Sequence, residues 1–204
     1  MHVAQKYTNI KGEVIQMKSG TKSITRLSVI APISGKLITL DEVPDPVFAE
    51  RILGDGLAVI PEDGKIYSPV DGEISSVTDT HHAYGFHSDD GLDILVHFGL
   101  ETVSLGGEGF ISHVNEGDRV KVGDLIAEVD MELLKEREIK TITPILVCDG
   151  AEGKELKFAC GTVKAGEDAV ITVADEEAEE AAEVSEELPK IEEKKKLGIN
   201  FDFL

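Results

Sequence analysis

Short apolar runs of strand length, separated by turn signals, limit what this chain can fold into more than any other feature. Residues 27–40, 56–77, 92–99 and 123–129 are rich in Val, Ile and Leu, and clusters of Gly, Pro and Asp interrupt them at short spacing. Short strands joined by such turns are typical of antiparallel β-sandwiches and barrels. The sequence therefore predicts an all-β fold, an antiparallel β-sandwich or barrel-like domain.

Two pairs of similar sequence segments indicate that the domain has an internal two-fold repeat. APISGKL at 31–37 is similar to SPVDGEI at 68–74, and DRVKVGDLIAEV at 118–129 is similar to GTVKAGEDAVITV at 161–173. Each is a strand, a glycine turn and a second strand, so we expect two related halves. Between the two ends of the chain, the helical signals are MELLKEREI at 131–139 and VPDPVFAERIL at 43–53, which predict one or two short helices.

Charge and composition argue against some classes of function. The formal net charge of −20 disfavours a nucleic-acid partner, because phosphate binding needs clustered Lys and Arg. No apolar run reaches the roughly 18 residues of a membrane span, and the first residues lack the pattern of a secretory signal. Cys148 and Cys160 have no CxxC spacing and are expected to be reduced and structural. These features predict a cytoplasmic protein.

The uneven charge divides the chain into three segments. Residues 1–26 carry five Lys or Arg against one Glu, and their apolar residues are spaced as on a helical face, so we expect 1–27 to be a disordered or amphipathic segment. Residues 174–204 carry 11 acids and 4 lysines and are expected to be a disordered acidic tail. Within this tail, LGINFDFL at 197–204 is apolar and could dock on another surface. The folded domain is expected at 28–173.

Four of the six histidines lie between His81 and Thr102, and one of them, His97, interrupts an apolar strand. A turn signal at 88–91 predicts a β-hairpin here. If the loop has two residues, His82 lies directly opposite His97, with Cβ atoms about 4.5 to 5.5 Å apart. If the loop has three residues with Gly91 at a bulge, the register shifts by one and the two histidines fall on opposite faces. The sequence leaves both registers open.

Two facing imidazoles would suit the transfer of a phosphoryl group. A histidine with an ordinary pKa near 6.5 is largely neutral at pH 7 and can accept a phosphoryl group on nitrogen. Val96 and Phe98 flank His97, so the reacting nitrogen would be shielded from water. The alternative is a hydrogen-bonded histidine with a purely structural role in the core.

Residues 91–103, GLDILVHFGLETV, resemble the active-site signature of the glucose-type EIIA proteins of the bacterial phosphoenolpyruvate-dependent sugar phosphotransferase system. The resemblance continues through APISGKL, EVPDPVFAERILGDGLAVIP, SPVDGEI, THHA, GEGF and EGDRVKVGD, over about residues 28–173. It implies an antiparallel β-sandwich and a phosphotransferase component. Such a component takes a phosphoryl group from the histidine of the small protein HPr and gives it to the cysteine of a sugar-specific EIIB domain of a membrane permease.

The resemblance also implies roles for individual residues. His97 matches the histidine phosphorylated through Nε2, His82 the second histidine that stabilises the phosphoryl group, and Thr80 the hydroxyl that orients His82. The positions that match the partner-docking face are Asp45, Val47, Phe48, Ile52, Leu95 and Glu101. We interpret Phe48 as an aromatic anchor on an exposed loop. No cofactor is implied, although His82 and His97 could bridge a zinc ion together with a partner's carboxylate.

Three other functions deserve comparison. A zinc hydrolase on a similar scaffold would need at least three protein ligands, and its HxxxD and HxH patterns do not occur. A biotinyl or lipoyl carrier would display a lysine, typically between methionines, and none is so placed. A regulatory binding protein that signals through its phosphorylation state would look the same in sequence. The sequence leaves open the sugar, any regulatory targets, the oligomeric state, the roles of residues 1–27 and 174–204, and whether the domain is free-standing.

Overall fold

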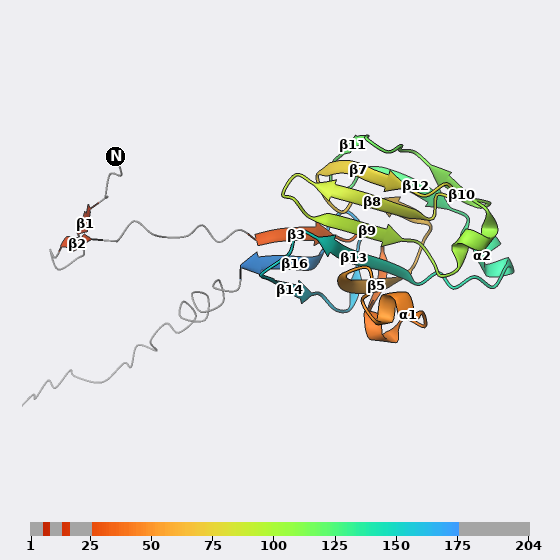
Figure 1. Ribbon diagram of the computed structural model, residues 1–204, viewed down its shortest axis with the longest axis horizontal. Helices are drawn as coiled ribbons and strands as arrows, with labels where there is room; N and C mark the ends of the chain where they lie inside the picture. The colour runs from red at the N-terminus through yellow and green to blue at the C-terminus, as the bar shows by residue number, and fades with distance from the viewer. Residues whose placement is uncertain (1–5, 9–13, 17–25, 176–204) are drawn as a thin grey trace, which may run out of the picture.

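The computed structural model describes residues 6–8, 14–16 and 26–175. Its centre is an antiparallel sheet of eight strands (Figure 1). In spatial order these are β11 (Arg119–Val120), β7 (Gly72–Val77), β8 (Ala83–Ser88), β9 (Asp93–His97), β13 (Thr143–Asp149), β5 (Asp55–Pro61), β4 (Gly35–Thr39) and β15 (Thr162–Val163).

Two sheets of three strands accompany the large one. The first contains β10 (Phe110–Ser112), β12 (Leu125–Val129) and β6 (Lys65–Tyr67). The second contains β14 (Lys154–Phe158), β16 (Ala169–Asp175) and β3 (Arg26–Ile30). The helical elements are η1 (Leu40–Glu42), α1 (Pro46–Ala49), η2 (Thr102–Leu105) and α2 (Met131–Glu136). The all-β prediction and both expected short helices are confirmed.

The strand order has the two-fold symmetry that the similar sequence segments predicted. The large sheet reads alike from both edges, because β11, β7, β8 and β9 correspond to β15, β4, β5 and β13. The small sheets correspond in the same way, β10-β12-β6 to β14-β16-β3. Gly72 and Gly35 occupy equivalent places at the starts of β7 and β4. A Cβ on Gly72 would lie 2.2 Å from the His87 oxygen, and one on Gly35 would lie 2.1 Å from the Ile60 oxygen.

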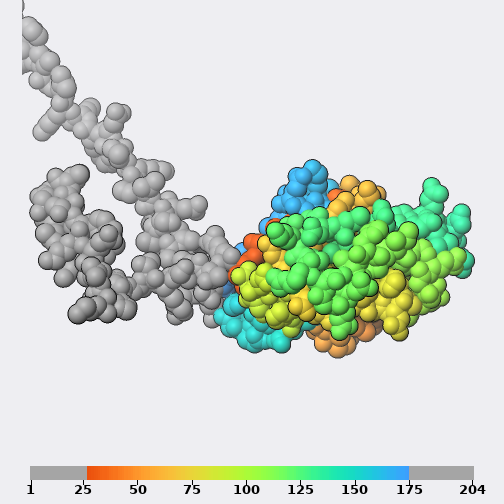
Figure 2. Space-filling view, turned by 90° about the horizontal axis from the view of Figure 1, so that it is seen from above, coloured from red at the N-terminus to blue at the C-terminus, as the bar shows by residue number. Residues whose placement is uncertain are grey.

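The main core lies between the large sheet and the two small ones. Side chains from both layers meet in one cluster, for example Tyr84 and Phe86 of β8 with Ile126 of β12 and Ile171 of β16. In the view turned by 90°, these layers form a body longer than it is wide (Figure 2). Alternate residues of the central strands point to the other face of the large sheet.

A second, smaller cluster covers part of that other face. Leu40, Phe48 and Leu100 pack there on Ala58 of β5 and Leu146 of β13. The segment η1–α1 therefore lies over the middle of the large sheet. Because His97 alternates with the buried Val96 along β9, its side chain emerges beside this cluster.

The first and last strands of the described body extend slightly beyond the bounds expected for the domain. The folded body starts at Arg26 with β3, and β16 extends to Asp175, two residues beyond the expected end. In the first segment, β1 (Lys6–Thr8) and β2 (Val14–Gln16) form an antiparallel pair, so these six residues are extended rather than helical. The rest of 1–25, and residues 176–204 of the acidic tail, lie outside the described residues.

No helix among the described residues is long and apolar enough to cross a membrane.

Candidate functional site

The β8–β9 hairpin has the register with the longer loop. Ala83 pairs with His97 and Tyr84 with Val96, and the loop consists of residues 89–91. Gly91 takes a positive φ of 85°, and its N–H donates to the Ser88 carbonyl at 3.0 Å. Glycine adopts this backbone conformation without strain. Of the two registers that the sequence left open, the one with Gly91 at the end of the loop is present.

The two histidine rings meet in spite of this register. Their centroids lie 4.7 Å apart, with the ring planes at 77°. His82 sits in a bend just before β8, where His81 has a φ of 56°. The bend is closed by Thr78, whose Oγ1 accepts from the Ala83 N–H at 3.1 Å. The expectation that this register would separate the histidines is therefore wrong, because strict alternation of faces ends at Ala83.

His97 is held in one tautomer. Its Nδ1 lies 2.9 Å from the carbonyl oxygen of Gly99. A carbonyl can only accept a hydrogen bond, so Nδ1 carries the proton and Nε2 keeps a free lone pair. Burial lowers the pKa of His97, while the hydrogen bond to Gly99 and the charge of Asp45 act in the opposite direction. His97 is therefore neutral at pH 7, with its nucleophilic nitrogen at Nε2.

His82 is also neutral, and more strongly so. Burial, followed by the proximity of His97, lowers its pKa to about 4. Its Nδ1 lies 2.6 Å from Oγ1 of Thr80. A hydroxyl can donate or accept, so this contact can hold His82 in the tautomer that carries its proton on Nε2. Thr80 lies behind His82 and is not among the residues that line the pocket.

The two histidines line a shallow pocket of about 250 Å³. Most of the residues expected on the docking face are here, and the full lining is Asp45, Val47, Phe48, Leu53, His82, His97, Glu101, Thr102 and Val103. Val47, Leu53 and Val103 are exposed, so the pocket has an apolar rim. The sequence analysis missed Leu53 and Val103, because their apolar character alone did not reveal that they stay uncovered.

Phe48 differs from its expected role. It is only 4% exposed and packs edge-on against His97, with ring centroids 5.2 Å apart. The interpretation as an exposed anchor is therefore wrong: Phe48 is a wall of the histidine pocket. The proline-rich loop suggested exposure, but α1 turns this side chain inward onto the second core cluster.

The other residues of the expected docking face lie around the pocket. Asp45 caps α1 by accepting from the Val47 N–H at 2.9 Å, and Glu101 has a left-handed φ of 59°. Ile52 is 63% exposed on the turn after α1. Leu95 shares a face of β9 with His97 and packs against the second cluster.

Metal ligands are few at this site. No group of three or more His, Cys, Asp or Glu that could hold a metal ion occurs within the described ranges. His82 and His97 supply two nitrogens, and Nδ1 of each is already engaged. A bridging zinc ion therefore has no support from the structure.

The fold and the site together define a class: an antiparallel β-sandwich protein with two neutral histidines side by side in a shallow pocket. The family model for the phosphoenolpyruvate-dependent sugar phosphotransferase system, EIIA 1, matches residues 27–152. The chain belongs to this family. It is a phosphocarrier, a phosphotransferase component that acts through a phosphohistidine.

Individual relatives agree with this assignment. The chain is 44% identical over 146 residues to the glucose-specific EIIA component of Halalkalibacterium halodurans, covering 71% of this chain and 84% of the relative. It is 45% identical over 148 residues to the protein of the same name from Oceanobacillus iheyensis, covering 72% and 90%. The solved glucose permease IIA from Mycoplasma capricolum superimposes with a TM-score of 0.68 at 40% identity, covering 72% of this chain and 96% of that one.

Proposed function

We propose that Nε2 of His97 accepts the phosphoryl group from the phosphohistidine of HPr and passes it to the cysteine of a sugar-specific EIIB domain. The observation that carries this proposal is the hydrogen bond from Nδ1 of His97 to the Gly99 carbonyl. It leaves Nε2 unprotonated in a pocket that an apolar rim surrounds.

The transfer is a pair of displacements at phosphorus. The Nε2 lone pair attacks the phosphoryl group, the N–P bond of the donor breaks, and the donor nitrogen keeps its electron pair. Because Nδ1 stays protonated, the phosphorylated His97 ring is cationic and a good leaving group. A cysteine thiolate then attacks phosphorus, and His97 returns to its neutral state. Positioning and charge stabilisation are the main demands of such a reaction.

His82 and Thr80 have supporting roles in this proposal. If the Thr80 hydroxyl donates to Nδ1 of His82, then Nε2 of His82 bears the proton and can donate to a phosphoryl oxygen on His97. The lowered pKa of His82 keeps the ring neutral before phosphorylation, so it does not repel a protonated histidine of the donor. Val47, Ile52, Leu53 and Val103 provide exposed apolar surface around the pocket for a transient partner.

The proposal places the protein in the cytoplasm, and two free cysteines agree with a reducing compartment. Since the relatives compared above are named glucose-specific, glucose is the sugar to test first.

The first test is phosphorylation by phosphoenolpyruvate, enzyme I and HPr, followed by intact mass. The wild-type protein should gain one phosphate that is labile in acid and stable in base, and His97→Gln should gain none. His113→Gln is the matched control, because His113 pairs with Glu128 and does not line the pocket. Normal labelling of His97→Gln would refute the assignment of the acceptor.

A second test separates the two histidines. His82→Gln should still accept phosphate but should pass it on more slowly, by about 10² to 10³, as for loss of one charge-stabilising donor. Rapid-quench transfer from the phosphorylated variant to an EIIB domain measures this step. Thr80→Val should slow the same step and Thr80→Ser should restore it. Unchanged onward transfer in His82→Gln would remove His82 from the mechanism, and failure to accept phosphate would mean that the two roles are exchanged.

A further inference from the structure

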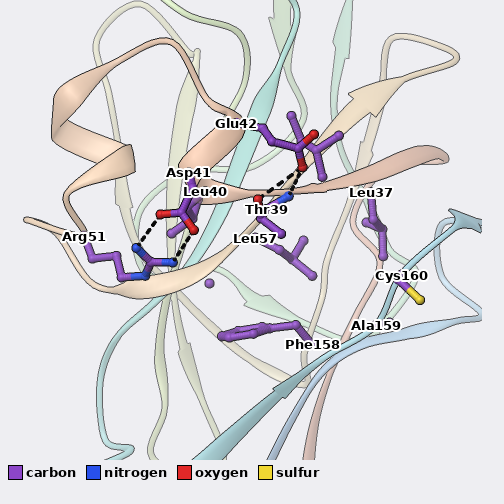
Figure 3. Close-up of a pocket in the computed structure, with 12 residues that line it drawn as sticks. Leu37, Thr39, Leu40, Asp41, Glu42, Arg51, Leu57, Phe158, Ala159 and Cys160 are labelled. Carbon is purple, nitrogen blue, oxygen red and sulfur yellow. Dashed lines mark hydrogen bonds and ion pairs between the residues drawn. The ribbon is translucent and has the colours of Figure 1, made fainter.

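A second pocket, also about 250 Å³ in volume, is lined by residues of β4, η1, β5 and the end of β14 and shares no lining residue with the histidine pocket. Its lining includes Leu37, Leu40 and Leu57, together with Phe158 of β14 (Figure 3). Phe158 is 42% exposed, although it is a large aromatic residue. Small-molecule sites usually exceed about 300 Å³, so this pocket suits one or two apolar side chains better than a cofactor.

The rim of this pocket carries negative charge. Asp41 and Glu42 lie at its edge, and the only cation among its lining residues is Arg51 (Figure 3). The guanidinium of Arg51 is already engaged, by Asp41 at 3.0 Å and by Asp55 at 2.9 Å. An occupant that combines aromatic side chains with flanking positive charge would therefore match this pocket.

Such a segment occurs in the chain itself. We propose that residues 194–204, KKKLGINFDFL, dock in this pocket, with Phe201 or Phe203 against Phe158 and the three lysines near the acidic rim. Neither the phosphoryl transfer nor the histidine pocket requires this segment. The proposal is therefore independent of the proposed function.

The distance between the attachment point and the pocket permits this docking. Lys154 pairs with Asp175, and Phe158 lies four residues further along β14. At about 3.3 Å per residue, the pocket is about 13 Å from the end of β16. Residues 176–193 stand between Asp175 and the docking segment. By random-coil scaling, 18 residues would span about 23 Å on average, which is more than the distance to the pocket.

The two cysteines of the chain provide a test. Cys160 lines this pocket and is exposed, whereas Cys148 is exposed elsewhere and serves as an internal reference. Iodoacetamide labelling of the native full chain, resolved by peptide mass, gives the rate at each thiol. If the tethered segment has an effective concentration of about 1 mM and an intrinsic Kd of about 0.1 mM, docking should lower the labelling rate of Cys160 about tenfold. The double variant Phe201→Ser, Phe203→Ser should remove this protection and leave the rate at Cys148 unchanged.

Two further variants locate the contact. In a chain that carries Phe158→Ser, adding Phe201→Ser and Phe203→Ser should no longer change the labelling rate of Cys160. Ile111→Ser should leave that effect intact, because Ile111 is equally an exposed apolar residue, 60% exposed, on β10, the counterpart of β14 in the other half. Equal Cys160 rates with and without Phe201 and Phe203 would overturn the proposal. Protection that depends on protein concentration would also overturn it, because the occupant would then be a second copy of the chain. Protection that disappears when residues 1–25 are deleted would overturn it as well, because the occupant would then be the other terminal segment.

Discussion

The chemistry of the site rests on which ring nitrogen carries a proton. A single carbonyl, that of Gly99, fixes the proton of His97 on Nδ1 and frees Nε2. Gly99 has a φ of 72°, and a Cβ there would lie 2.6 Å from Cγ2 of Thr102. Glycine is therefore required at the residue that orients His97. The signature that contains His97 thus includes both the proposed nucleophile and the group that fixes its tautomer.

The buried His82 should make stability depend on pH. Its pKa is about 4 in the folded protein and near 6.5 when unfolded, so the unfolded state binds the proton more readily. Above pH 6.5, His82 is neutral in both states and its burial costs no stability. As the pH falls from 6.5 through 4, protonation favours the unfolded state and the free energy of unfolding decreases. Between pH 7.5 and 4.5, the wild-type protein should lose about 2 to 3 kcal/mol more than His82→Gln.

Urea unfolding at the two pH values measures this difference. The other titratable groups that line the pocket, His97, Asp45 and Glu101, are present in both proteins, so their own titration largely cancels. Identical pH dependence in the wild type and in His82→Gln would contradict the lowered pKa of His82.

Among the secondary-structure elements, a bend and a hairpin bring the two histidines of the pocket together. The bend that Thr78 closes turns His82 toward His97, and β8 must keep its register for the two rings to meet. That register depends on the close approach of β7, where Gly72 lies against the backbone of His87 and Ser88. The position of His82 is thus coupled to a glycine at the other end of β8.

Gly72→Ala tests this dependence. The added Cβ would lie 2.2 Å from the His87 oxygen, so β7 and β8 must separate. We expect a loss of about 2 to 4 kcal/mol in the free energy of unfolding. Gly117→Ala is the control, because its Cβ would meet nothing within 4 Å and only its φ of 88° opposes the substitution, at about 1 to 2 kcal/mol. Chemical denaturation measures the stability of both variants. If Gly72→Ala proved the more stable of the two, the close approach of β7 and β8 would not require a glycine at this position.

The sequence predicted the hairpin and its histidines well, and the bend and the residues around the pocket less well. His97 and His82 stood out, because a polar residue in an apolar strand and a histidine cluster beside a turn are local signals. Thr80 was identified only through the resemblance to the glucose-type EIIA proteins. The bend at His81 was not predictable, since φ values above zero are rare for histidine and no glycine marks the position. The burial of Phe48 and the exposure of Leu53 and Val103 depend on how α1 lies over the sheet, which is a tertiary property.

For the whole molecule, the internal repeat explains the architecture. Two similar halves pair β9 with β13 at the centre of the large sheet, and each half adds one small sheet. The similar sequence segments predicted the duplication, because equivalent turns keep equivalent glycines. They could not predict which half contains the pocket: the paired histidines lie in β9 and the preceding bend, and not in the corresponding part of the other half.

The folded body should be independent of the acidic segment. The core clusters and the histidine pocket consist of residues between Leu27 and Val173. A chain ending at Asp175 should fold and accept phosphate at the wild-type rate. Loss of a docked segment that is about 90% bound costs about 1.4 kcal/mol, which lowers Tm by no more than about 6 °C. Calorimetry and a phosphorylation time course check both expectations, and a fall of well over 10 °C would instead place essential packing in residues 176–204.

The proposed phosphoryl transfer through His97 is tested most directly by determining which atom carries the phosphoryl group. Protein labelled with ¹⁵N in histidine and phosphorylated by HPr can be studied by ¹⁵N and ³¹P NMR, which distinguishes the two ring nitrogens. We predict one phosphate, coupled to Nε2 of His97, with Nδ1 of the same ring still protonated. A phosphate on His82, on a cysteine, or on Nδ1 of His97 would contradict it.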